Sequence, residues 1–134
     1  MSAGRRPILI VEDDDDLIAC LRAVLDEERR PMIAVHDGVS AVAACREHPL
    51  LVLVDLNIPG GLTGASLLAS LRDTLGHDTP LILLSAERDL SLRAHELGAD
   101  GSLEKPFDID DLLRLIDDEA RRVGDTDEQP AAHP

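Results

Sequence analysis

Five short runs of apolar residues alternate along the chain with segments of helical periodicity, and this alternation restricts the fold more than any other feature. The runs are ILIV at 8–11, MIAV at 32–35, LLVLV at 50–54, LILL at 81–84 and the weaker GSLE at 101–104. Strands that are apolar at consecutive positions are buried on both faces, as in parallel sheets covered by helices. The sequence therefore predicts an α/β domain in which helices cover both faces of a five-stranded parallel sheet.

The segments that follow these runs place apolar residues three and four positions apart, which is the spacing of one helix face. They predict helices near 17–25, 38–46, 68–75, 90–97 and 109–123. Asp14 or Asp15 and Asp108 are placed to cap the first and last helices, because a carboxylate accepts hydrogen bonds from the free N–H groups there. Gly76 and Gly98 are placed to end the third and fourth.

The length of 134 residues is sufficient for one domain with its own core. We expect an N-terminal extension at 1–6, the folded domain at 7–123 and a polar, disordered C-terminal tail at 124–134. Because only this tail follows the last predicted helix, we expect a stand-alone domain, with a piece of a longer protein as the alternative. No apolar run approaches the ~20 residues of a membrane span and no secretory signal is visible, so we expect a cytoplasmic protein without membrane insertion.

The charge of the chain limits the classes of partner that it can bind, and its cysteines indicate the redox environment. Acidic residues outnumber basic ones 27 to 13, for a formal net charge of −14. This balance argues against direct nucleic-acid binding, which needs cationic groups, but it is compatible with a small cation or a basic protein. Cys20 and Cys45 lie in predicted helices without the spacing of a metal or redox motif. We therefore expect reduced thiols in the core.

Polar side chains follow four of the predicted strands at the point where each strand ends. Glu12 and Asp13 follow the first, Asp55 the third, Ser85 the fourth and Lys105, the only lysine, the fifth. Ligands of open parallel sheets bind beyond the carboxyl ends of the strands. If the first and third strands are neighbours, the three carboxylates converge and repel one another unless a cation is bound.

Mg²⁺ suits such a site, because it prefers oxygen ligands and keeps several waters. The ammonium group of Lys105 could hold a phosphoryl oxygen, and Ser85 could donate a hydrogen bond to it. Each feature also has an ordinary interpretation: a solvated helix start for the acidic run, a surface ion pair for Lys105 and a turn hydroxyl for Ser85. The position of Asp55 at the end of a separate buried strand favours the metal site.

Four motifs at these strand ends carry a family resemblance. They are ILIVEDD, LVLVDLNIPGG, LILLSA and GADGSLEKPF, in this order along the chain. The chain resembles the receiver domain of two-component response regulators over about residues 7–123. The resemblance implies the flavodoxin-like (βα)5 fold and a signalling domain that catalyses only its own phosphorylation and dephosphorylation, rather than an enzyme acting on other substrates.

The resemblance implies that Asp55 is the phospho-acceptor. It would receive a phosphoryl group from the phosphohistidine of a sensor histidine kinase or of a histidine phosphotransfer protein. Asp13, the carboxylate of Asp55 and the backbone carbonyl of Asn57 would bind Mg²⁺, and Glu12 would act through a metal-bound water. Signalling would follow by protein–protein interaction with a downstream target that the sequence does not identify.

The resemblance also implies roles for the remaining strand-end residues. Lys105 would pair with the phosphoryl group and Ser85 would hydrogen-bond it, while Ala86 would leave room for access. The bond between Lys105 and Pro106 would be cis. Asn57 and Glu87 would set the lifetime of the acyl phosphate.

One position departs from the family pattern. Receivers usually carry Tyr or Phe three residues before the motif lysine, where this chain has Ser102, and its single aromatic residue is Phe107. We expect phosphorylation chemistry to persist, with a smaller change than usual at residues 100–104. A homodimer through the face formed by residues 90–97, 101–104 and 109–123 is a further expectation.

Four alternatives were weighed. A receiver-shaped module that works without phosphorylation has no need of the full set of strand-end residues, although Ser102 keeps this interpretation open. A receiver from a hybrid kinase or longer regulator would carry the same motifs. A phosphatase of the haloacid dehalogenase class would need a second aspartate where Asn57 stands. A dinucleotide-binding domain would need a glycine-rich turn after the first strand, where this chain has carboxylates that repel pyrophosphate.

Overall fold

The computed structural model describes residues 5–55, 64–86 and 90–125. The elements, in chain order, are β1 (Ile8–Val11), α1 (Asp15–Glu27), β2 (Met32–Val35), α2 (Gly38–Ala44), the short 3₁₀ helix η1 (Cys45–Glu47), β3 (Leu51–Asp55), α3 (Gly64–Leu75), β4 (Leu81–Ser85), α4 (Leu90–Leu97), β5 (Gly101–Glu104) and α5 (Ile109–Val123). The predicted alternation of five strands and five helices is confirmed.

The five strands form one parallel sheet in the order β2-β1-β3-β4-β5. The chain moves from β1 to β2 on one side and then to β3 on the other, so the strand order reverses around β1. As a result, the carboxyl ends of β1 and β3 are neighbours, with Val11 opposite Val54. This is the arrangement that the convergence of the strand-end carboxylates requires.

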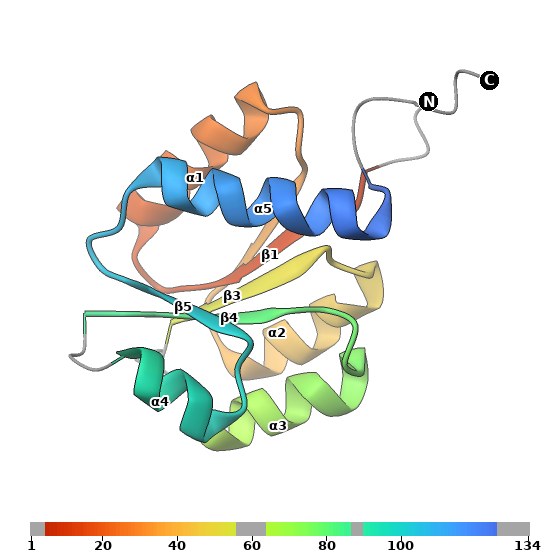
Figure 1. Cartoon of the computed structure of the whole chain (residues 1–134), viewed down its shortest axis with the longest axis vertical. Coiled ribbons are helices and arrows are strands. Elements are labelled where there is room, and N and C mark those ends of the chain that lie inside the picture. Colours follow the sequence, from red (N-terminus) through yellow and green to blue (C-terminus); the bar gives the residue numbers. More distant parts are fainter. Residues whose placement is uncertain (1–4, 56–63, 87–89, 126–134) are drawn as a thin grey trace.

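Helices cover both faces of the sheet (Figure 1). Helices α1 and α5 pack on one face and α2, α3 and α4 on the other. Successive strand residues point to opposite faces, so Leu53 contacts the first layer while Val52 and Val54 contact the second. β5 lies at the sheet edge, where Glu104 is exposed and the other three residues of GSLE are partly buried.

The predicted helix caps are present. Of the two candidates at α1, Asp14 is the cap, and its side chain accepts hydrogen bonds from the N–H groups of Asp16 (3.0 Å) and Leu17 (3.2 Å). Asp108 caps α5 through the N–H of Asp110 at 3.0 Å. These caps satisfy donors that the helices leave free and fix where the segments after β1 and β5 turn into helices.

One sequence expectation differs from the structure. Cys20 is exposed, whereas Cys45 is buried as predicted. The buried stripe of α1 is formed by Ile18, Leu21 and Leu25, and position 20 lies beside this stripe rather than on it.

Within the described part of the chain, no helix is long and apolar enough to cross a membrane.

Residues at both ends of the predicted domain also contact its body. Arg5, Arg6 and Asp125, assigned to the terminal extensions from the sequence, make hydrogen bonds with the body of the domain. Residues 5, 6 and 125 thus contact the domain, while the bounds at 7 and 123 remain a prediction. Side-chain contacts with segments far away in sequence were invisible to a boundary assignment based on hydrophobic periodicity.

Leu53 lies on the central strand and has no exposed surface. We expect Leu53→Ala to lower the free energy of unfolding by about 3 kcal/mol, through lost burial and the cavity left between the sheet and the helices. Leu92→Ala is the matched control, because Leu92 is 59% exposed and should change stability by less than about 0.5 kcal/mol. Thermal unfolding followed by circular dichroism measures both, and equal losses would contradict the core position of Leu53.

Candidate functional site

Three carboxylates converge at the carboxyl ends of β1 and β3. Oxygen atoms of Glu12, Asp13 and Asp55 all lie within 4.8 Å of one another. Lys105, which follows β5, reaches the same place: its Nζ lies 2.8 Å from Glu12 Oε1 and 3.1 Å from Asp55 Oδ2. The structure thus brings together four of the strand-end residues that the sequence predicted to form one site.

Glu12 is the most enclosed residue of the group, with no exposed surface. Its Oε2 accepts hydrogen bonds from the backbone N–H groups of Asp13 and Asp14, both at 3.1 Å, while Oε1 accepts from Lys105. Burial raises the pKa of Glu12, and the adjacent Asp55 adds to the rise, against the lowering effect of Lys105. Glu12 therefore fixes the loop that carries Asp13 and anchors the lysine at the same time.

Lys105 neutralises the buried carboxylates. Burial acts to lower the pKa of its ammonium group, but the hydrogen bonds to Glu12 and Asp55 outweigh this effect and the pKa is raised. The ammonium group therefore stays protonated at neutral pH and faces both carboxylates. The chain leaves Lys105 through a cis bond to Pro106, the isomer that the family resemblance implied.

The described carboxylates fit a hard divalent cation. All three potential ligands offer oxygen atoms, the donor type that Mg²⁺ prefers. Asp13 is exposed and Asp55 is 5% exposed at the same spot, so a cation with several waters could approach from the side of Asp13. Both oxygens of Glu12 are already hydrogen-bonded, which agrees with a contact through water. Asn57, the third predicted ligand, lies outside the described residues.

β4 lies beside β3 on the side away from β1, so its carboxyl end is also next to Asp55. Ser85 is buried there, and its backbone carbonyl accepts the N–H of Lys105 at 2.7 Å, which ties the lysine segment to β4. Ala86 follows at the exposed rim, and Glu87 lies outside the described residues. Ser102 is half-buried on β5, in the position where the sequence departs from the family pattern.

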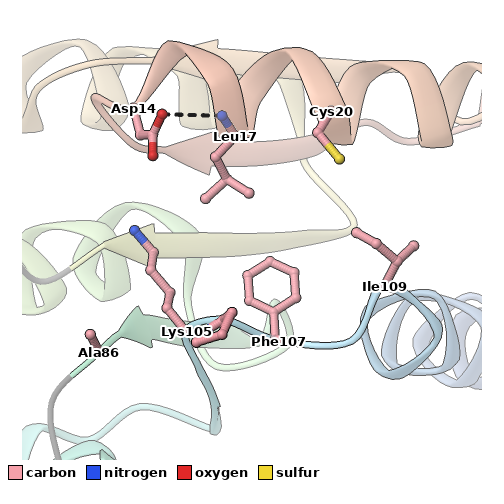
Figure 2. Close-up of a pocket in the computed structure, with 8 residues that line it drawn as sticks. Asp14, Leu17, Cys20, Ala86, Lys105, Phe107 and Ile109 are labelled. Atoms are coloured by element: carbon pink, nitrogen blue, oxygen red, sulfur yellow. Dashed lines mark hydrogen bonds between the residues drawn. The ribbon is translucent and has the colours of Figure 1, made fainter.

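A pocket of about 440 Å³ adjoins the site. Figure 2 shows it between the start of α1 and the segment that follows β5, with Lys105 and Ala86 at one end. Leu17, Phe107 and Ile109 supply apolar walls, and Cys20 lies on the same side as Leu17. The sequence analysis did not identify these walls, although Phe107, the single aromatic residue next to the lysine, was a signal that could have indicated them.

The raised pKa of Glu12 predicts a pH-dependent contribution to the stability of the metal-free protein. A carboxyl group whose pKa is higher in the folded state contributes stability at low pH, and this is lost as the pH rises through the folded-state pKa. We therefore expect the free energy of unfolding of the wild type, relative to Glu12→Gln, to fall as the pH rises from below the ordinary carboxyl pKa of 4.5 through the raised folded-state pKa. Each unit of difference between folded and unfolded pKa corresponds to about 1.4 kcal/mol.

Thermal unfolding in EDTA, followed by circular dichroism over this pH range, measures the effect of Glu12, because the chain has no tryptophan or tyrosine for fluorescence. Asp16→Asn, a change at an exposed acid of the same run, is the control. A difference between wild type and Glu12→Gln that grows in favour of the wild type as the pH rises would show that the bond to Lys105 outweighs burial.

Comparisons with known sequences agree with this arrangement. The response regulator receiver domain family matches residues 8–117. The transcriptional regulatory protein CpxR of Klebsiella pneumoniae is 39% identical over 114 residues, covering 81% of this chain and 47% of that protein. The DNA-binding response regulator MtrA of Mycobacterium bovis is 35% identical over 134 residues, covering 98% of this chain and 56% of that protein. The chain spans about half the length of these curated relatives.

Two solved structures with the same fold are described as receiver domains. The receiver domain of the Francisella response regulator 1452 superposes with a TM-score of 0.76 at 26% identity, covering 88% of this chain and 98% of that chain. The receiver domain of the sensor histidine kinase PA1611 of Pseudomonas aeruginosa gives 0.75 at 29% identity, covering 91% and 99%. That structure has a magnesium ion coordinated in its active site cleft. The chain is therefore a member of the response regulator receiver domain family.

Proposed function

We propose that this chain accepts a phosphoryl group on Asp55 in a Mg²⁺-dependent reaction, as part of a two-component system. The observation that carries the proposal is the convergence of Glu12, Asp13, Asp55 and Lys105 at the carboxyl ends of β1 and β3. A buried carboxylate held beside an ammonium group and an exposed second carboxylate has the parts that phosphoryl transfer needs. These are a nucleophile, charge neutralisation and access from one side.

The transfer step follows from these positions. A carboxylate oxygen of Asp55 attacks the phosphorus of a phosphohistidine, an acyl phosphate bond forms, and the phosphorus–nitrogen bond breaks with its electron pair remaining on the histidine. Lys105, already in contact with Asp55, stabilises the negative charge on the phosphoryl oxygens, and Ser85 donates a hydrogen bond to one of them. Bound Mg²⁺, held by Asp13, Asp55 and the carbonyl of Asn57, would supply further charge neutralisation.

The phosphodonor in this proposal is a sensor histidine kinase or a histidine phosphotransfer protein in the cytoplasm. The apolar pocket beside Lys105 offers a contact surface next to the acceptor, with Leu17 and Phe107 on facing walls. A downstream protein would read the phosphorylated state, and a homodimer through α4, β5 and α5 is one form of output. The stand-alone arrangement and the alternative of a longer regulator both accommodate this chemistry.

Three further residues complete the proposal. Asn57 lies two positions after the acceptor and Glu87 two positions after Ser85, and both would control how water reaches the acyl phosphate. Ser102 replaces the usual switch aromatic on β5, so the added charge of roughly −1.5 to −2 should act mainly on Ser85, Lys105 and the segment after β4. A large rearrangement of residues 100–104 on phosphorylation, seen in amide chemical shifts, would contradict this role of Ser102.

Intact-mass spectrometry after incubation with acetyl phosphate tests the proposed function. We expect the mass to rise by one phosphoryl group in the presence of Mg²⁺ and to remain unchanged in EDTA. The same samples examined by circular dichroism show whether the fold is intact. No gain in a folded sample with Mg²⁺ would favour a receiver-shaped module that binds partners without being phosphorylated.

A further inference from the structure

A second cluster of charges lies at the amino ends of the strands, at the opposite end of the sheet from the proposed acceptor site. Two arginine pairs that lie far apart in sequence, Arg5-Arg6 and Arg29-Arg30, meet there. Arg5 Nη1 donates to the carbonyls of Glu28 (2.7 Å) and Arg29 (2.8 Å).

Arg30 lies at the centre of this cluster and is 2% exposed. Its Nη1 forms an ion pair with Asp125 Oδ2 at 2.7 Å and also donates to the carbonyl of Arg6 at 3.0 Å. Its Nη2 donates to the backbone carbonyl of Asp125 at 3.0 Å. The guanidinium group therefore holds both the side chain and the main chain of the residue that follows the end of α5.

Asp125 is held from several directions. The same Oδ2 atom that pairs with Arg30 accepts the backbone N–H of Arg6 at 3.0 Å. The N–H of Asp125 donates to the carbonyl of Ala120 at 2.8 Å, after Gly124 has turned the chain with φ of 75°. A positive φ of this size suits glycine, and the turn directs Asp125 back toward the sheet instead of extending α5.

The N-terminal arm, formed by residues 5–7, is bound to the same cluster. Arg6 donates from Nε to the carbonyl of His48 at 3.0 Å and from Nη2 to that of Pro49 at 2.8 Å. The carbonyl of Pro7 accepts the N–H of Leu50 at 2.7 Å. The arm, the turn after α1, the segment before β3 and the residue after α5 are thus joined at one place, and Figure 1 shows the end of α5 beside the start of β1.

The burial of Arg30 indicates that its ion pair fixes the position of Asp125 rather than adding to the stability of the domain. Burial lowers the pKa of the guanidinium group, with Asp125 opposing the shift. The Nε atom is buried and has no hydrogen-bond partner among the described residues. A buried ion pair whose hydrogen bonds are incomplete regains little of its desolvation cost, and such pairs can often be replaced by apolar residues without loss of stability.

We propose that Arg30 and Asp125 form an ionic latch that fixes the point where the chain leaves α5 and ties that exit to the N-terminal arm. Asp125 is then held at the amino ends of the strands, at the opposite end of the sheet from the acceptor site and beside the arm. With the latch open, the exit and the arm loosen together while the core of the sheet is unaffected. The inference does not depend on phosphorylation of Asp55.

Hydrogen exchange of the full chain, followed by mass spectrometry, tests the latch. The variants are Asp125→Asn and Arg30→Met, with Asp118→Asn as the control, because Asp118 forms an exposed ion pair with Arg121 on the same helix. We expect amides of the arm and of residues 120–125 to exchange about tenfold faster or more in both latch variants. Peptides from β3 and β4, and all peptides of the control, should keep the wild-type rates.

Three results would overturn the latch. Unchanged exchange at the arm and exit in both variants would show that other contacts hold them. Faster exchange at the exit alone would show that the arm is not tied to it. Faster exchange spread equally over β3 and β4 would show a general stabilising contact.

Discussion

Replacing Asp55 by asparagine is expected to abolish the gain of one phosphoryl group on incubation with acetyl phosphate and Mg²⁺. The amide has nearly the same shape, and it can still accept a hydrogen bond from Lys105, which now contacts Asp55 at 3.1 Å. It lacks the anionic oxygen that attacks phosphorus, so the nucleophile is lost while the surroundings are kept. Intact-mass spectrometry should therefore show the unmodified mass at all times.

The matched control for Asp55 is Asp16→Asn. Asp16 lies in the first turn of α1, belongs to the same acidic run and is exposed. It should be phosphorylated at a rate within about twofold of the wild type, because an exposed charge is strongly screened by water and salt. Phosphorylation of Asp55→Asn at the wild-type rate would place the acceptor at another carboxylate. Peptide mapping of the modified protein would then identify that residue.

Replacing Lys105 by methionine is expected to have two opposite effects. The rate of phosphorylation should fall by about 10²–10³-fold, the usual loss when one preorganised group that stabilises transition-state charge is removed. Mg²⁺ should bind more tightly, by roughly tenfold, because the ammonium group competes with the cation for the charge of Glu12 and Asp55. Methionine keeps the apolar stem of the side chain, so the pocket wall beside Phe107 should persist.

Isothermal titration calorimetry measures the Mg²⁺ affinity of Lys105→Met, and time-resolved intact-mass spectrometry measures its phosphorylation. Arg114→Met is the control, since Arg114 is an exposed cation paired with Asp111 on α5, and it should leave both quantities unchanged. Lys105→Arg keeps the charge in a larger planar group and should recover only part of the rate. Weaker Mg²⁺ binding by Lys105→Met than by the wild type would contradict competition between the ammonium group and Mg²⁺.

The architecture could be predicted because its signals are local. Consecutive apolar residues mark strands buried on both faces, and residues such as Leu21 and Leu25 repeat at helical spacing. Asp14 and Asp108 could be assigned as caps for the same reason, since a cap acts on its own first turn. GSLE gave the weakest strand signal because Leu103 is the single apolar side chain among its four residues.

The site could be predicted only in part. The sequence placed Asp55 and Lys105 at strand ends. The contact between them depends on the order of the strands in the sheet, and local sequence patterns do not determine that order. The double role of Glu12, holding the loop with one oxygen and Lys105 with the other, required the folded geometry of both segments. Cys20 was misassigned because apolar spacing does not settle on which side of a helix stripe a neighbouring residue falls.

Sequence alone determined the fold class, the succession of elements and the identity of the residues at the strand ends, because these follow from periodicity and from short motifs. Tertiary structure alone decided that β1 and β3 are neighbours, that Glu12 is fully enclosed and that Arg30 meets Asp125, 95 positions away. The physical reason is the same in each case. A contact between distant segments depends on how the whole chain packs, whereas the formation of a helix or strand depends mainly on residues nearby in sequence.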